Sequence, residues 1–143
     1  MSSKSYLKSE ILYALYQLDP AEFENFIGKI WHRIGWETNV TDHFNDDGVD
    51  IVAHRDDLFS QKHLIQAKRF GPDKEIAKHT VEKYSNLKET KEMADVVIII
   101  TTSSFTESAE QRASELNVKL VDGEALASYI IKTESFGIVE EYS

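Results

Sequence analysis

Apolar residues recur along this chain with two different periods, and each period predicts a type of element. A spacing of three and four residues marks one face of a helix, whereas strict alternation marks a strand with two unlike faces. A continuous apolar run indicates a strand that is covered on both faces. The helical pattern occurs at residues 6–18, 20–34, 74–94, 106–116 and 123–132.

Five strands are predicted between these helices, and their order indicates the fold class. The polar run 55–62 is typical of a hairpin connection, and the β-branched run 96–100 is expected at the centre of the sheet. Strands that later alternate with helices favour an α/β domain with a mixed central sheet, antiparallel at the hairpin and parallel where helices cross over. The strands are predicted at residues 36–41, 48–54, 63–70, 96–100 and 118–121.

Length and composition favour one globular domain. The chain has 143 residues, of which 41% are hydrophobic and 29% charged, and it has no cysteine. We expect residues 19–132 to form the domain, residues 1–18 a helical extension, and residues 133–143 a loosely held tail. Without an apolar signal core or a run long enough to span a membrane, a cytoplasmic protein with no membrane partner is the expectation.

The charge is distributed unevenly along the chain. The net charge is −9, which argues against a generic nucleic-acid binder, but residues 59–91 carry 8 Lys and Arg against 4 Asp and Glu. This basic stretch fits either a contact with a phosphate backbone or an ordinary solvated helix face. The basic residues are Lys62, Lys68, Arg69, Lys74, Lys78, Lys83, Lys88 and Lys91.

Polar side chains on two neighbouring strands form the candidate site. Asp50 faces away from Ile51, and Gln66 shares one strand face with Lys68, so the three converge if the strands pair. A carboxylate and an amide oxygen are hard ligands of the kind that Mg²⁺ takes, and a lysine there meets water or phosphate. The alternative interpretation is the exposed polar face of an antiparallel hairpin.

Hydroxyl groups gather after the apolar run 96–100. Thr101, Thr102 and Ser103 precede a helix, so they either hold a phosphate or cap that helix. His43 and His54 lack the paired spacing of metal ligands, and surface positions are expected for both. No Gly-rich phosphate loop and no Gly-x-Ser-x-Gly turn occurs, so nucleotide triphosphate hydrolysis and acyl transfer have no candidate residues.

Four segments, in order, resemble the catalytic domain of the Mrr restriction endonucleases. Asp50 followed by Gln66-Ala67-Lys68 is similar to the Asp…Gln-x-Lys variant of the PD-(D/E)xK nuclease superfamily. The resemblance extends over about residues 20–132. Its segments are Phe23-Glu24 with Gly35, Asn45-Asp46-Asp47-Gly48-Val49-Asp50, Gln66-Ala67-Lys68-Arg69, and Thr101-Thr102-Ser103-Ser104-Phe105-Thr106 with Val121-Asp122-Gly123.

The resemblance implies a restriction-endonuclease-like fold and a Mg²⁺-dependent DNA endonuclease, with Mn²⁺ able to replace Mg²⁺. In this interpretation Asp50, Gln66 and the Ala67 carbonyl bind the metal, and Glu24 completes its surroundings. Glu24 also has an ordinary explanation, because a glutamate in the first turn of a helix is favoured by the helix dipole. Lys68 orients or activates the attacking water and stabilises charge on the phosphate.

The implied partner is DNA. A homodimer is expected because one module has one catalytic centre, whereas duplex DNA has two strands to cut. Two alternatives stay open: a structure-specific nuclease of the Holliday-junction resolvase type, and a catalytically inactive DNA-binding or interaction module in which Gln66 marks lost metal affinity. The residues expected to contact DNA are Arg69, Lys74, Lys78, Thr102 and Ser103.

Overall fold

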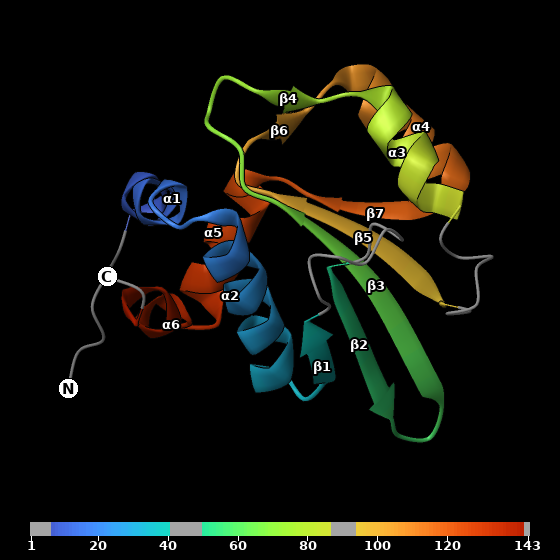
Figure 1. Ribbon diagram of the computed structural model, residues 1–143, viewed down its shortest axis with the longest axis horizontal. Helices are drawn as coiled ribbons and strands as arrows, with labels where there is room; N and C mark the ends of the chain where they lie inside the picture. The colour runs from blue at the N-terminus through green and yellow to red at the C-terminus, as the bar shows by residue number, and fades with distance from the viewer. Residues whose placement is uncertain (1–6, 41–49, 87–93, 142–143) are drawn as a thin grey trace.

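A five-stranded mixed sheet forms the middle layer of the computed structural model, which describes residues 7–40, 50–86 and 94–141 (Figure 1). The first three strands pair antiparallel and the last three pair parallel, so the predicted mixed α/β sheet is confirmed. In spatial order the strands are β1 (Glu37–Val40), β2 (Ile51–Asp56), β3 (Ser60–Lys68), β5 (Val96–Thr101) and β7 (Val118–Val121).

The hairpin between β2 and β3 is longer than the sequence predicts. Asp56 pairs with Ser60, so the connection is residues 57–59 and the prediction of a loop over 55–62 is wrong at both ends. The hairpin extends past the core into solvent, so both faces of these strand ends carry polar residues. The alternation of apolar and polar residues that predicts a strand is therefore absent there. The run 96–100, predicted at the centre of the sheet, forms β5, which lies one place from the middle strand β3, so that prediction is wrong by one strand. As an interior strand between β3 and β7, β5 still pairs on both sides.

Helices cover the sheet on both faces, and each face has its own hydrophobic core (Figure 1). One core contains Ile51, Ile65 and Ile100, whereas the other contains Leu64 and Ile99, so alternate residues of each strand enter different cores. On the first face lie α1 (Lys8–Tyr16), α2 (Pro20–Arg33), α5 (Gly123–Lys132) and α6 (Phe136–Glu140). On the second lie α3 (Lys78–Ser85) and α4 (Glu107–Leu116).

The helix starts follow the capping signals of the sequence. Asp19 accepts a hydrogen bond from the Glu22 N–H at 2.7 Å, and Glu22 in return accepts from the Asp19 N–H at 2.9 Å. Gly35, with φ of +103°, follows α2 in the left-handed conformation that glycine adopts readily. Within the described residues, no helix is both long and apolar enough to cross a membrane.

The predicted long helix over 74–94 is wrong at its beginning. Glu75–Ile76 forms a short strand, β4, which pairs parallel with β6 (Ser104–Phe105), and α3 begins only at Lys78. The Thr106 N–H also donates to the Ile76 carbonyl at 3.0 Å, so this segment is tied to the start of α4. The partner of β4 is almost thirty positions away in sequence, which a local periodicity cannot reveal. Residues 87–93 lie outside the described residues.

The prediction of a loosely held tail from residue 133 is wrong for residues 133–141. Ser135 and Val139 are buried, and α6 contributes Val139 to the core that α1, α2 and α5 share. Lys29 of α2 pairs with Glu141 at 3.0 Å. The predicted helical extension belongs to the same core, since Ile11 and Leu15 of α1 are fully buried in it.

A stack of rings closes the first core near the hairpin end of the sheet. The Trp36 and His63 ring centroids are 4.0 Å apart, and the Arg55 guanidinium lies 4.8 Å from the centre of Trp36. Trp31 Nε1 donates to His63 Nδ1 at 3.4 Å. Burial lowers the pKa of His63, an effect that Arg55 reinforces and Asp95 opposes. The stack therefore favours neutral His63.

The start of α5 meets the end of β5 without room for a side chain, which gives a test of the packing. A Cβ on Gly123 would overlap the Thr102 carbonyl oxygen and lie 2.9 Å from its carbon. We predict that Gly123→Ala lowers the free energy of unfolding by about 1–3 kcal/mol, because the carbonyl is backbone and must shift. Urea unfolding followed by circular dichroism measures the change.

Gly137→Ala is the matched control, because nothing lies within 4 Å of a Cβ at Gly137 in α6. There alanine is expected to stabilise by about 0.5–1 kcal/mol through its higher helix propensity. Equal free-energy changes for the two variants would contradict the close approach of α5 to Thr102.

Candidate active site

The polar ends of β2 and β3 meet on one face of the sheet. Ile51 pairs with Ile65, so the next step of the antiparallel register sets Asp50 opposite Gln66. Opposite residues project from the same face, and Lys68 lies two positions beyond Gln66 on that face. Leu64 belongs to the core beneath α3 and α4, which identifies the face. The predicted convergence of Asp50, Gln66 and Lys68 is thus consistent with the register.

Beyond the last pair of β2 and β3, the Asp50 carboxylate accepts a hydrogen bond from the β3 backbone. The Asp50 N–H donates to the Ile65 carbonyl at 3.1 Å, and Asp50 Oδ2 accepts from the Ala67 N–H at 2.8 Å. The carboxylate therefore supplies the acceptor that a further strand residue would supply. The Ala67 carbonyl leaves β3 on the same side as its N–H, because both groups of one residue point to the same neighbouring strand. Asp50 and this carbonyl are therefore on one side of β3.

Gln66 carries a buried oxygen that lacks a hydrogen-bond donor. The residue is 7% exposed, and among the described residues its Oε1 has no partner. An unsatisfied buried polar group costs about 1–3 kcal/mol, so it calls for an explanation. A cation beside Asp50 and Gln66 would supply one, because carboxylate and amide oxygens suit Mg²⁺ and Mn²⁺.

Within the described residues, the possible metal donors include few negatively charged groups. Across the described ranges, no three His, Cys, Asp or Glu side chains come together in a way that could hold a metal ion. Among the residues that the structure describes, Asp50 and the neutral Gln66 amide are side-chain donors at this strand end, with the Ala67 carbonyl beside them. Such a set fits an ion that keeps several water ligands, as Mg²⁺ does.

Glu24 comes from the other layer of the molecule. It is 7% exposed and lies in the second turn of α2, so the prediction of a first-turn position is wrong, and Glu22 is the acidic residue of the first turn. The helix packs against β1, β2 and β3 on the first core face. Asp50 and Gln66 belong to the opposite face, so a role for Glu24 at the metal requires it to reach past the sheet at the β2 start. Its predicted part in metal binding stays a prediction.

Lys68 is half-buried at the end of β3, with its ammonium group between two aromatic rings. Lys68 Nζ lies 5.3 Å from the ring centre of Tyr84 in α3 and 5.9 Å from that of Phe70. The last turn of α3 therefore forms one wall of the site. Tyr84 is not predicted as a site residue, because its spacing in the sequence indicates only the apolar side of a helix.

Hydroxyl groups at the end of β5 and just after it bind the backbone at the end of β3 and just after it. Thr101 Oγ1 donates to the Lys68 carbonyl at 2.7 Å. Thr102 Oγ1 donates to the Phe70 carbonyl at 2.6 Å and accepts from the Phe70 N–H at 2.9 Å. These bonds extend the pairing of β3 with β5 beyond the last ladder pair, Lys68 with Thr101. The turn from Lys68 to Phe70 is fixed as a result.

The capping explanation for these hydroxyls is wrong. Thr106 caps α4, with its hydroxyl accepting from the Ala109 N–H at 3.1 Å. Thr102 is 1% exposed and Ser103 is also buried, with the Ser103 hydroxyl 3.0 Å from that of Thr101. Contact of Thr102 and Ser103 with DNA stays a prediction, and their bonds in this structure are to the protein itself.

Basic side chains surround the same strand end. Lys74 is exposed, with Nζ 4.3 Å from the Phe70 ring centre, and Lys78 is exposed at the start of α3. Arg69 is partly buried, and its Nε has no partner among the described residues. These three residues follow Lys68 closely in sequence and lie on the loop and helix that flank it.

The histidines do not enlarge the site within the described residues. His54 Nε2 lies 3.0 Å from the Glu37 carboxylate, in a cross-strand pair of β1 and β2. This position agrees with the expected surface role. His43, Asp46 and Asp47 lie outside the described residues.

Comparison with known proteins gives a family match over most of the chain. The model of the Mrr catalytic domain, described as "Restriction endonuclease", matches residues 15–130. The "Type IV methyl-directed restriction enzyme EcoKMrr" of Escherichia coli (strain K12) is 32% identical over 132 residues. The match covers 87% of this chain and 42% of that enzyme, so the chain spans less than half of its curated relative.

Two solved structures share the fold. The "DNA modification-dependent restriction endonuclease AspBHI" aligns with a TM-score of 0.68 and 14% identity, covering 99% of this chain and 45% of that one. The "MspJI Restriction Endonuclease in Complex with 27-mer Oligonucleotide" aligns with a TM-score of 0.63 and 18% identity, covering 99% and 40%. At such identities the likeness concerns the fold.

The unpaired Gln66 oxygen should lower the free energy of unfolding of the metal-free protein. Gln66→Met keeps a long side chain and removes the buried amide, so we expect the free energy of unfolding in EDTA to rise by about 1 kcal/mol or more. Gln17→Met, at an exposed position, is the control and should change stability by less than about 0.5 kcal/mol. A destabilised Gln66→Met protein would show that the amide is satisfied.

Proposed function

Because the chain belongs to the Mrr family of restriction endonucleases, we propose that it is a metal-dependent DNA endonuclease hydrolysing phosphodiester bonds. The catalytic residues in this proposal are Asp50, Gln66 and Lys68, with Glu24 assisting. The observation that carries it is the buried, unpaired Gln66 oxygen opposite an Asp50 carboxylate anchored to Ala67.

The metal would be held at the start of β2 and the end of β3. Enzymes of this family generally use divalent ions. Asp50, Gln66 Oε1 and the Ala67 carbonyl would be its protein ligands, and the ion is Mg²⁺, with Mn²⁺ as a substitute. A bound ion of this class lowers the pKa of water and polarises a phosphate oxygen. Because Gln66 is neutral, the Glu24 carboxylate would supply the second negative charge.

Lys68 would act on the reacting groups. Its ammonium has three N–H donors, which suit a phosphate oxygen and the attacking water. Since charge on the phosphate oxygens builds up during attack by water, a donor fixed nearby stabilises the transition state more than the ground state. The hydrogen bonds from Thr101 and Thr102 hold the turn that follows Lys68, and these two residues position the lysine.

DNA would approach the face that carries α3. Lys74, Lys78 and Lys83 are exposed beside the site, and Arg69 follows Lys68 directly. These cations would bind phosphates on both sides of the cleaved bond, whereas the rest of the chain is acidic enough to give the whole a net charge of −9 and repels DNA elsewhere. This charge pattern supports a defined DNA path and weak unspecific binding.

The names of the relatives suggest which DNA to test. One is described as methyl-directed and another as DNA modification-dependent, so we propose methylated duplex DNA as the substrate class. Cutting both strands requires two centres, which a homodimer would provide. The second candidate is a DNA-binding module without catalysis, which is favoured by the neutral Gln66 and by the lack of an acidic cluster in the described residues.

A cleavage assay tests the endonuclease directly. Methylated, unmethylated and four-way-junction DNA are incubated with the protein in Mg²⁺, Mn²⁺ or EDTA. We predict metal-dependent cleavage that Asp50→Asn and Lys68→Ala each reduce by about 100-fold or more, because each removes a group at the reacting phosphate.

Asp57→Asn at the hairpin tip and Lys132→Ala in α5 are the matched controls, and both should retain wild-type rates. Preference for the junction would identify a structure-specific nuclease in place of a restriction-type enzyme. Binding without cleavage in every metal would reject the enzyme and favour the inactive module.

A further inference from the structure

Three lysines and two aromatic rings alternate along one side of the candidate site. The Lys68 ammonium faces both rings, at 5.3 Å from the centre of Tyr84 and 5.9 Å from that of Phe70. Each ring carries a second lysine, Lys74 at 4.3 Å from Phe70 and Lys83 at 5.3 Å from Tyr84. All these distances are within the range of an attraction between a cation and a ring face.

The members of this row differ in burial. Tyr84 is 5% exposed and packs in the core beneath α3 and α4, whereas Lys74 and Lys83 are exposed to solvent. Lys68 is half-buried, between the exposed lysines and the core. The attraction of a ring for a cation increases as water is removed, so the contact with Tyr84 is the strongest for Lys68.

An aromatic ring attracts an ammonium group without occupying its N–H donors. A carboxylate beside Lys68 would neutralise its charge and occupy its N–H donors, which are the groups that a phosphate needs. In the described part of the chain, no carboxylate forms an ion pair with Lys68. The faces of Tyr84 and Phe70 attract the positive charge through their quadrupoles and leave the donors available.

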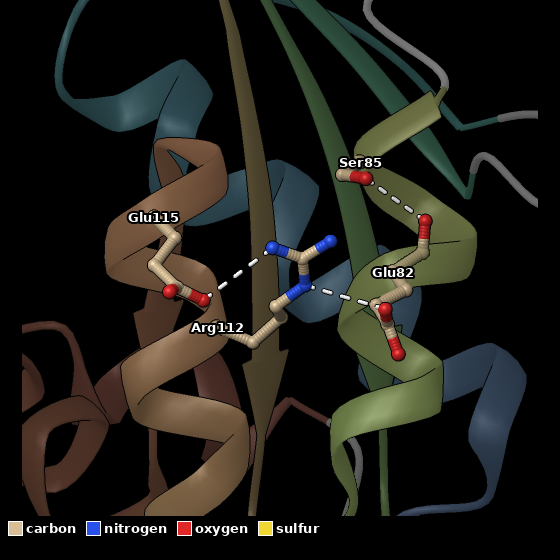
Figure 2. A network of polar contacts seen from close by, with 4 residues as sticks. All are labelled: Glu82, Ser85, Arg112 and Glu115. Atoms are coloured by element: carbon tan, nitrogen blue, oxygen red, sulfur yellow. Dashed lines mark hydrogen bonds and ion pairs between the residues drawn. The ribbon is translucent and has the colours of Figure 1, made fainter.

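Tyr84 belongs to α3, which packs against α4, and a polar contact between Glu82 and Arg112 joins the two helices (Figure 2). Arg112 of α4 reaches across to α3, where its Nε donates to Glu82 at 3.2 Å, and it also contacts Glu115 at 3.4 Å. Ser85 donates to the Glu82 carbonyl at 2.8 Å. The helix turn that contains Tyr84 is thus connected both to α4 and to the core.

We propose that Tyr84, supported by Phe70, is a positioning residue that holds the Lys68 ammonium in the site. This inference rests on the proposed nuclease function. Lysine has a flexible four-carbon stem, so without the rings its ammonium would spend part of its time away from the phosphate. Loss of the ring therefore slows the chemical step more than it weakens DNA binding.

Two substitutions of Tyr84 separate the ring from the hydroxyl. Tyr84→Phe keeps the ring, and we expect its single-turnover cleavage rate to stay within about twofold of wild type. Tyr84→Leu removes the ring, and its rate should fall by about 3- to 30-fold, which corresponds to the strength of such contacts. DNA affinity, measured by fluorescence anisotropy in Ca²⁺, should change by less than the rate in both variants.

Phe105→Leu is the matched control. Phe105 is an aromatic residue of the same core and is buried to the same degree, 6% exposed against 5% for Tyr84. If the effect of Tyr84→Leu arose from weakened packing alone, Phe105→Leu would slow cleavage equally. If Tyr84→Leu does not fold, Phe70→Leu replaces it, because Phe70 is only partly buried.

A measurement that is independent of cleavage completes the test. Protons beside the Lys68 ammonium should resonate upfield of those of exposed lysines in an NMR spectrum, because ring currents shield them. This displacement should persist in Tyr84→Phe and decrease in Tyr84→Leu. Unchanged Lys68 signals in Tyr84→Leu, or equal rates for Tyr84→Leu and Tyr84→Phe, would overturn the inference. A displaced signal in a protein that cuts no DNA would support the ring contact and reject the nuclease.

Discussion

The hydrogen bond between the Ala67 N–H and Asp50 Oδ2, 2.8 Å long, extends the sheet and also positions the carboxylate of the candidate active site. β2 begins at Ile51, so the backbone of β3 beyond Ile65 needs another acceptor, and the Asp50 carboxylate provides it. The same contact fixes the carboxylate opposite Gln66 and beside the Ala67 carbonyl. Strand pairing and placement of the acidic group therefore depend on one side chain.

The two faces of the sheet separate stability from chemistry. On one face α1, α2, α5 and α6 cover a core that includes Phe23 and Phe26, both fully buried. On the other face, α3 and α4 cover a smaller core that ends at Gln66 and Lys68, where polar side chains are buried or partly buried. The unpaired Gln66 oxygen weakens that end of the domain, and burial elsewhere offsets the cost.

Much of this arrangement follows from local sequence. Asp19 and Pro20 mark the start of α2 because capping depends on a few adjacent residues, and Thr106 marks α4 for the same reason. The shared face of Gln66 and Lys68 follows from the two-residue period of a strand.

Other features depend on contacts between distant segments, which periodicity does not encode. Glu75–Ile76 is a strand only because Ser104–Phe105 lies beside it. Val139 is buried only because it packs into the core that α1 and α2 also form. The hydroxyls of Thr101 and Thr102 are of the kind found in phosphate sites, yet they donate to the backbone carbonyls of Lys68 and Phe70. Tyr84 has an apolar helix spacing, and its place beside Lys68 appears only in three dimensions.

Calorimetric titration of Mn²⁺ into wild type, Asp50→Asn and Gln66→Glu tests the metal site between Asp50 and Gln66 most directly. We expect one ion per chain for wild type and affinity at least about tenfold weaker for Asp50→Asn, since the anchored carboxylate is lost. Tighter binding is expected for Gln66→Glu, because a second negative charge then faces the ion. Equal affinities in all three proteins would contradict a metal site between Asp50 and Gln66.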